Sequence, residues 1–158
     1  GTRPGPVLLV NATGAINAST KAELLRLKPA HIVVLGGTGV VSASVFNLLK
    51  AYAPAGQIAR YAGSDRYGTA ASISAHTFAA SCGCSVYVSA GTDFNGALSA
   101  AAAAGTLRGP LLLVATTGAI PAATATELTR LKPAQIIVVG NTSLVSAAVY
   151  NLLAAYVP

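Results

Sequence analysis

The sequence predicts an α/β protein of three layers, with helices on both faces of mostly parallel sheets. Short apolar runs alternate along the chain with segments whose apolar residues recur at helical spacing, which is typical of parallel strands joined by helices. Of the 158 residues, 53% are hydrophobic, mainly Ala, Val, Leu and Ile, with no Met or Trp. This is ample material for a core of helices packed on sheet.

A duplication organises the chain. Residues 1–54 match residues 105–158 at an offset of 104 positions, with 34 identities in the 54 aligned pairs. We therefore expect residues 57–158 to be one complete repeat and residues 1–56 to be the second half of a preceding one. The first half of that preceding repeat would belong to a cut or processed parent chain, or would be supplied by another molecule.

Each copy shows the order strand, helix, strand, helix. The expected elements are strands at 7–10 and 31–35 and helices at 18–27 and 42–51, repeated at 111–114, 135–139, 122–131 and 146–155. Thr20 with Glu23, and Thr124 with Glu127, have the spacing of a helix capping box, although Pro121 indicates an earlier start for the second helix.

The unrepeated middle continues the alternation. A short strand is expected at 57–60, a helix at 66–80 with Ser64 or Asp65 as its N-cap, a strand at 85–89 and an alanine-rich helix at 95–105. Short connections with right-handed crossovers then give a mostly parallel sheet.

The charge favours an anionic partner. Ten Lys and Arg against four Asp and Glu give a net charge of +6. The basic residues are dispersed and lack the aromatic interleaving of nucleic-acid modules, so the partner need not be nucleic acid, and an anionic polysaccharide or cell-wall polymer fits equally well. They are Arg3, Lys21, Arg26, Lys28, Lys50, Arg60, Arg66, Arg108, Arg130 and Lys132. The apolar stretch 136–157 is interrupted at 140–143, so we expect strand, loop and helix there and no membrane insertion.

Enzymatic and cofactor chemistry has little support. The glycine-rich turn at 36–39 lacks the acidic residue about twenty positions on that a dinucleotide site needs, and we expect it to form a tight turn with positive φ. No Gly-x-Ser-x-Gly elbow is present, and the few acidic residues do not suggest an acid–base pair. We therefore expect no catalysis and no cofactor. Cys82 and Cys84 are either two free thiols or a local disulfide, and a metal site is not expected.

Most of the unrepeated charge lies in residues 60–70, Arg-Tyr-Ala-Gly-Ser-Asp-Arg-Tyr-Gly-Thr-Ala, at the join of the two copies. Arg60 and Arg66 can bind phosphate or carboxylate groups bidentately, and the alternative for each is an ion pair with Asp65 or plain exposure. Tyr61 and Tyr67 either stack on sugar rings or pack beside a core.

Three further motifs follow this stretch in fixed order: Val-Tyr-Val-Ser-Ala-Gly-Thr-Asp-Phe at 86–94, Gly-Pro-Leu-Leu-Leu-Val at 109–114 and Ile-Ile-Val-Val-Gly at 136–140. Together the four motifs resemble the cell wall binding repeat 2 family, over essentially the whole chain. The resemblance implies a Rossmann-like or flavodoxin-like fold, usually in three tandem repeats, in surface proteins and autolysins of Gram-positive bacteria. It also implies noncovalent anchoring to anionic cell-wall polymers.

The resemblance implies a set of ligand-binding residues. They are Arg60, Asp65, Arg66 and Tyr67 of the Arg and Asp-Arg-Tyr signature, with Pro6, Leu8, Leu9, Pro110, Leu112 and Leu113 of two Pro-Leu-Leu stretches. The chain departs from the family pattern at Gly96, where the family has an acidic residue. Asp93 is able to take over the helix-capping part of that role.

We therefore expect a noncatalytic extracellular module, secreted or on the cell wall, that anchors a protein to an anionic polysaccharide or teichoic-acid-like polymer of a Gram-positive bacterium. The alternative is a self-assembling structural or adhesive surface protein, in which residues 1–54 pair with other chains through unpaired strand edges. The first reading requires salt-sensitive wall binding, and the second requires a homo-oligomer.

Overall fold

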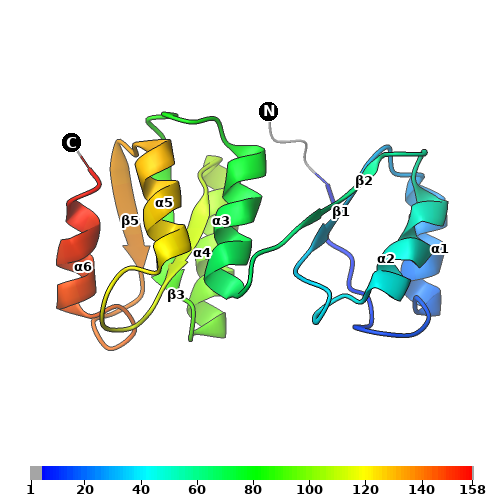
Figure 1. Ribbon diagram of the computed structural model, residues 1–158, viewed down its shortest axis with the longest axis horizontal. Coiled ribbons are helices and arrows are strands. Elements are labelled where there is room, and N and C mark those ends of the chain that lie inside the picture. The colour runs from blue at the N-terminus through cyan, green and yellow to red at the C-terminus, as the bar shows by residue number, and fades with distance from the viewer. Residues whose placement is uncertain (1–4, 158) are drawn as a thin grey trace. The chain divides into compact units, whose positions relative to one another are not determined.

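The computed structural model describes residues 5–157, which form two compact units divided after Ser64 (Figure 1). We call residues 5–64 the N-terminal unit and residues 65–157 the C-terminal unit. Residues 1–4 and 158, which include Arg3 and the outer ends of both predicted repeats, lie outside the described residues.

The C-terminal unit is a three-stranded parallel sheet with four helices. Its elements are α3 (Arg66–Thr77), β3 (Ser85–Ala90), α4 (Phe94–Leu107), β4 (Leu111–Val114), α5 (Ala122–Leu131), β5 (Gln135–Val139) and α6 (Ala147–Ala154). β3 lies between β4 and β5. Tyr87 in its middle stands opposite Leu111 on one side and Ile137 on the other.

Alternation of side chains gives this sheet two covered faces. On one face Val88 of β3 and Leu112 of β4 belong to the main core, together with Leu128 of α5 and Val149 of α6. On the other face α4 lies against β3, and its Ala100 is fully buried. Figure 1 shows α4 and α5 on opposite sides of the strands. The three-layer α/β class predicted from the sequence is confirmed.

The N-terminal unit pairs only two strands. Its elements are α1 (Ala18–Leu27), β1 (Ile32–Leu35), α2 (Ala43–Leu49), the 3-10 turn η1 (Lys50–Tyr52) and β2 (Ile58–Tyr61). β2 runs parallel to β1, with Leu35 opposite Tyr61. Leu24, Val34, Val45 and Leu49 form a small core in which α1 and α2 pack against β1.

The helices agree closely with the sequence prediction, but one capping expectation is wrong. α1 is capped by Asn17, whose side chain accepts from the Thr20 amide at 2.8 Å. The Thr20 hydroxyl instead donates to the carbonyl of Leu9, and the Thr124 hydroxyl donates to that of Leu113, both at 2.7 Å. The two threonines therefore fasten each helix to the segment before it. Pro121 is the N-cap residue of α5, so this helix starts before Thr124, as the sequence indicates.

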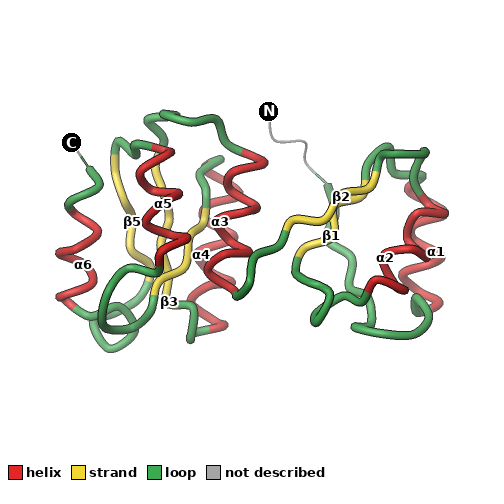
Figure 2. Tube along the Cα trace, viewed as in Figure 1, coloured by secondary structure: helices red, strands yellow, loops and turns green. Residues whose placement is uncertain are grey.

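The strand predicted at 7–10 is also wrong. These residues are irregular, and Figure 2 draws them as loop, although their copy forms β4. β4 pairs with β3, and residues 5–64 contain no counterpart of β3, so the segment has no neighbouring strand to bond. Leu8 and Val10 still pack against the small core, whereas Val7 and Leu9 are 83% and 79% exposed.

The sequence repeat and the compact units divide at different places. β2, at the start of the predicted repeat 57–158, pairs with β1 of the preceding half. The assignment of residues 1–56 and 57–158 as repeat units stays a prediction. Residues 136–157 form strand, loop and helix as expected. None of the helices described between residues 5 and 157 combines the length and the apolar character needed to cross a membrane.

Candidate binding site

The carboxyl ends of β3 and β4 lie side by side in the C-terminal unit, at the edge where open parallel sheets bind ligands. The Gly91 amide, just beyond β3, donates to the carbonyl of Val114 at 2.8 Å. The hydroxyls of Thr92 and Thr116 are 3.1 Å apart, so the loops after both strands are linked. This edge brings polar groups from separate loops together.

Arg66 and Tyr67 lie across the end of β3. The Arg66 guanidinium donates to the carbonyl of Gly91. A Cβ at Gly91 would stand 2.6 Å from Cε1 of Tyr67 and 3.1 Å from Cδ of Arg66. The two side chains therefore pack closely over Gly91 and leave no room for a side chain at this position. Arg66 is exposed and Tyr67 is half-buried. A guanidinium has five N–H donors, so Arg66 keeps donors for a ligand after bonding Gly91.

Two aspartates at this edge are occupied by helix capping. Asp65 caps α3 by accepting from the Gly68 amide at 2.7 Å, which confirms one of the two predicted N-caps. Asp93 caps α4 by accepting from the Gly96 amide at 2.9 Å, as the departure at Gly96 led us to expect. A Cβ at Gly96 would lie 2.3 Å from the Asp93 carboxylate, so the glycine leaves room for this cap.

Arg60 belongs to the N-terminal unit and is held by that unit. Its guanidinium donates to the carbonyl of Gly36 at 2.6 Å and to that of Ser42 at 3.5 Å. It also lies 5.0 Å from the ring centroid of Phe46, within the range of a cation–π contact. Arg60 is half-buried, and these contacts fix β2 against α2.

The two Pro-Leu-Leu stretches have different environments. Pro6 and Leu9 are exposed and Leu8 is half-buried in the N-terminal unit. In the C-terminal unit Pro110 and Leu112 are fully buried, and Leu113 is half-buried. The structure therefore brings Arg66 and Tyr67 together at one sheet edge, with Asp65 at the start of the same helix. Arg60, Pro6, Leu8 and Leu9 lie in the other unit.

Sequence reasoning missed the loop residues Gly91, Thr92 and Thr116. Their positions directly after two parallel strands were the available signal. The capping-box spacing predicts Glu23 and Glu127 as cap residues, but each instead pairs with the arginine three positions on. Within residues 5–157, no three His, Cys, Asp or Glu side chains gather as a metal site would require.

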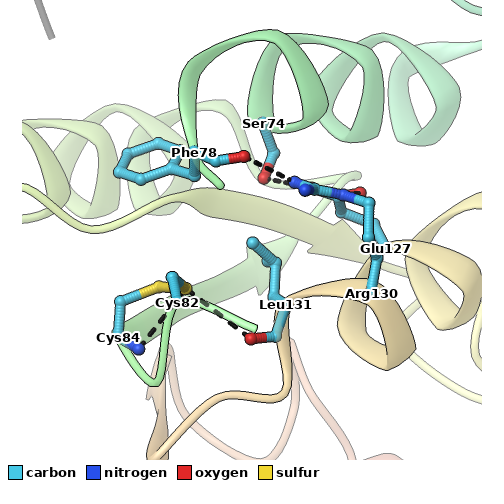
Figure 3. Close-up of a disulfide and its surroundings, with 7 residues drawn as sticks. All are labelled: Ser74, Phe78, Cys82, Cys84, Glu127, Arg130 and Leu131. Atoms are coloured by element: carbon cyan, nitrogen blue, oxygen red, sulfur yellow. Dashed lines mark hydrogen bonds and ion pairs between the residues drawn. A yellow bond between two sulfur atoms is a disulfide. The ribbon is translucent and has the colours of Figure 1, made fainter. Parts of the chain in front are cut away.

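The second of these pairs forms a buried network (Figure 3). Glu127 accepts from Arg130 Nε at 2.8 Å and from the Ser74 hydroxyl of α3, while Arg130 also donates to the carbonyl of Phe78 at 3.0 Å. Hydrogen bonding to Glu127 raises the pKa of Arg130. Below the network, Cys82 and Cys84 form a disulfide, which resolves the alternative that the sequence left open. The bonds from Glu127 to Ser74 and from Arg130 to Phe78 tie α5 to α3.

Comparison with known families decides the class of the module. A family model described as Cell wall binding domain 2 (CWB2) matches residues 60–150, more than half of the chain. The chain belongs to this family. The family suggested by the four sequence motifs is thereby confirmed, and the chain is a cell wall-associated module. The matched region includes the whole candidate site at the carboxyl ends of β3 and β4, with Arg66, Tyr67 and the loops after both strands.

Solved structures share the fold of this CWB2 chain. Cwp8 from Clostridium difficile matches with a TM-score of 0.77 and 22% identity, over 96% of this chain and 25% of that one. Cwp6 from the same organism matches with a TM-score of 0.78 and 23% identity, over 90% and 22%. This chain thus spans about a quarter of their length. A search of curated proteins found no match.

Proposed function

We propose that this CWB2 chain is a noncatalytic extracellular module that holds a protein to an anionic polymer of a Gram-positive cell wall, either a teichoic-acid-like polymer or an anionic polysaccharide. The observation that carries the proposal is the family match over residues 60–150. The net charge of +6 supports it, because long-range attraction concentrates an anionic polymer at a basic surface.

Of the two signature arginines, Arg66 has the better access to a polymer, because Arg60 is half-buried. Arg66 is exposed at the carboxyl edge of the sheet and keeps guanidinium donors for a phosphate or carboxylate. Tyr67 and the loop after β4 would shape the contact beside it. Asp65 would position Arg66 by starting α3, and Pro110, Leu112 and Leu113 would position the strand end. In the N-terminal unit, Arg60 and the segment Pro6 to Leu9 would take part in polymer binding.

The absence of catalysis is part of the proposal, and the carboxylates support it. The sequence has four acidic residues, and each is engaged. Asp65 and Asp93 cap helices, while Glu23 and Glu127 bind Arg26 and Arg130. Acid–base catalysis by a carboxylate needs a carboxyl group that is free to exchange a proton with substrate.

The test of the electrostatic part removes charge without loss of fold. Lys28, Arg108 and Lys132 end three helices with positive φ, a conformation that glycine adopts without strain. We expect Lys28→Gly/Arg108→Gly/Lys132→Gly to keep its melting temperature and to bind purified walls about tenfold more weakly at low salt, because each lost charge weakens attraction. Ser81→Gly, at an uncharged position of positive φ, is the matched control. Wall retention that stays constant from low to high salt would contradict this part.

The polymer itself is tested on chemically stripped walls. Walls from which phosphate polymers have been extracted should lose most of the bound chain if a teichoic-acid-like polymer is the ligand. Unchanged binding to stripped walls, together with loss after carboxyl groups are blocked, would point to the anionic polysaccharide. Equal binding to all preparations would contradict anionic polymer binding altogether.

Exposed apolar side chains favour self-assembly as a second candidate function. Val7 and Leu9 are 83% and 79% exposed, and Val33 and Leu35 of β1 are 44% and 48% exposed. Such residues are typical of a surface that another polypeptide covers. Under this reading the chain sediments as an oligomer, and Val7→Ser/Leu9→Ser makes it monomeric. A monomer at high concentration would exclude it.

A further inference from the structure

The two copies present corresponding surfaces on β1 with α2 and on β5 with α6. The Ser42 amide donates to the carbonyl of Ala12 at 2.8 Å, and its counterpart Ser146 donates to that of Thr116 at 3.0 Å. Gly36 and Gly140, which follow the two strands, both have positive φ. The loops and helices beside the strands therefore have the same local architecture.

In the N-terminal unit this surface is occupied by β2. The Ile32 amide donates to the carbonyl of Gln57 and the Gly36 amide to that of Tyr61, both at 2.9 Å. Arg60 on β2 then reaches the Gly36 carbonyl and the Phe46 ring. β2 thus docks through backbone bonds along one strand edge and one arginine anchor.

In the C-terminal unit the same edge carries no strand among the described residues. Amides alternate between the two edges of a strand, and Tyr87 of β3 uses its amide on the β4 side. The register of β3 with β5 then places Ile137 toward β3, and Ile136 and Val138 toward the outer edge of β5. Ile136 is the counterpart of Ile32, so the outer edge of β5 corresponds to the edge of β1 that β2 occupies.

Exposure differs between the copies at the positions that β2 covers. Gly36 and Val34 are buried, but Gly140 is exposed and Val138 is half-buried. Phe46 is half-buried under Arg60, whereas Tyr150, its counterpart, is 57% exposed. Among residues 5–157, the outer edge of β5 is therefore an unoccupied copy of a site that β2 occupies on β1.

Two adjoining grooves lie along this edge. One of about 490 Å³ is lined by Val138, Gly140, Asn141, Thr142 and Tyr150 among others. The other, of about 360 Å³, continues past Ile136 and Leu153 and shares Val138 and Tyr150 with the first. The first groove contains the counterparts of Gly36 and Phe46, the residues that hold Arg60. Asn141 replaces Gly37, where a Cβ would stand 3.9 Å from the carbonyl of Gly63, so a side chain is tolerated there.

We propose that the outer edge of β5 and the groove beside α6 dock the first strand of a further repeat of this kind, an extended peptide with the chemistry of residues 57–64. Its backbone bonds the amides of Ile136, Val138 and Gly140, as β2 bonds β1. Its arginine donates to the Gly140 carbonyl and stacks on Tyr150, whose ring serves a cation as well as phenylalanine does. Docking by strand addition takes affinity from the backbone and specificity from such side-chain pockets. This inference does not depend on which polymer the module binds.

The experiment appends such a strand at the spacing of the repeat. Residue 158 is the counterpart of residue 54, so a copy of residues 55–64 is appended directly after it. We expect hydrogen exchange at Ile136, Val138 and Gly140 to slow at least about tenfold, since newly paired strand amides are protected. The melting transition of the C-terminal unit should rise by about 2–4 °C.

Matched variants separate the parts of the proposal. An extension with alanine in place of the arginine, and Tyr150→Ala in the extended chain, should each lose most of the added protection. A scrambled extension should give none. Unchanged exchange in the extended chain would overturn the proposal. Protection of the same amides in the unextended chain that grows with protein concentration would also overturn it, because a second copy would then be the occupant.

Discussion

Identical residues in the two copies have different surroundings, which decide what each contributes. The side chains of Glu23 and Arg26 are 34% and 69% exposed, whereas those of Glu127 and Arg130 are only 5% and 28% exposed. The second pair also bonds Ser74 and the Phe78 carbonyl, because α3 covers it. An exposed ion pair contributes little to stability, but a buried charge that loses its partner is costly.

Removal of the two glutamates should therefore lower the free energy of unfolding by different amounts. Glu127→Ala should lower the free energy of unfolding by about 2–4 kcal/mol, since it removes the carboxylate that accepts from Arg130 and Ser74 in a largely buried site. Glu23→Ala, the matched change in the other copy, should cost less than about 1 kcal/mol. Chemical denaturation of both variants measures the difference. Equal losses of unfolding free energy in the two variants would show that burial of Glu127 by α3 does not change what the ion pair contributes to stability.

The exposed pair predicts a measurable titration. Hydrogen bonds from Arg26 lower the pKa of Glu23 from its usual 4.5, and this effect outweighs the opposing effect of desolvation. A carboxyl group with a lowered folded pKa stabilises the fold above its unfolded pKa, and this contribution is lost as pH falls through the folded pKa. NMR titration should place Glu23 below 4.5, and Arg26→Ala should move it back upward. An unaltered titration in Arg26→Ala would rule out the pair as the cause.

At the scale of elements, helices were predictable and one strand was not. α1 and α5 begin and end where the sequence pattern places them, because a helix bonds within its own segment. A strand needs a neighbour, so the near-identical segments 7–10 and 111–114 differ in structure. The same limit applies to the site. Residue spacing indicated Asp65 as a cap, but only the pairing of β3 with β4 brings Thr92 to Thr116.

Substitution of the two signature arginines should separate effects on stability from effects on wall binding. Arg60→Ala removes the bonds to Gly36 and Ser42 and the contact with Phe46, so we expect it to destabilise the N-terminal unit by about 2–3 kcal/mol. Arg66→Ala removes an exposed side chain with one carbonyl partner and should cost less than about 1 kcal/mol. Wall binding should fall in Arg66→Ala at full folded content. Full wall binding by Arg66→Ala would remove Arg66 from the proposed site.

The chain enters β4 through Gly109, where only a glycine fits. Gly5, the counterpart of Gly109 in the first copy, is under no such restriction. A Cβ at Gly109 would stand 2.3 Å from the Ser85 carbonyl and 2.9 Å from the Tyr87 ring, whereas nothing lies within 4 Å of that position at Gly5. Gly109→Ala should therefore lower the free energy of unfolding by about 2–4 kcal/mol through overpacking. Gly5→Ala should stay within about 0.5 kcal/mol. Comparable effects at the two positions would argue against the close packing of β4 on β3.

At the scale of the whole molecule, the duplicated sequence does not give two equal structures. β2 pairs with β1 of the half-repeat before it, while the corresponding edge of β5 carries no strand among the described residues. The sequence identities between the copies reveal the period of the repeat. They do not reveal which strand pairs with each edge strand. Pairing is decided by which segments the rest of the chain brings side by side.

The disulfide predicts how the whole molecule responds to reduction. Cys82 and Cys84 close a loop of three residues, and both contact the main core of the C-terminal unit. Loop-closure entropy for so short a loop gives a stabilisation of only about 1.6 kcal/mol. We expect Cys82→Ala/Cys84→Ala to fold, to lose no more than this in free energy of unfolding and to bind walls as well as the parent, because the bridge lies away from Arg66. Reduction of the parent should give the same melting temperature as the double variant. A loss several times larger would mean that the bridge sets the entry of β3 into the sheet, and the module would then depend on an oxidising compartment to fold.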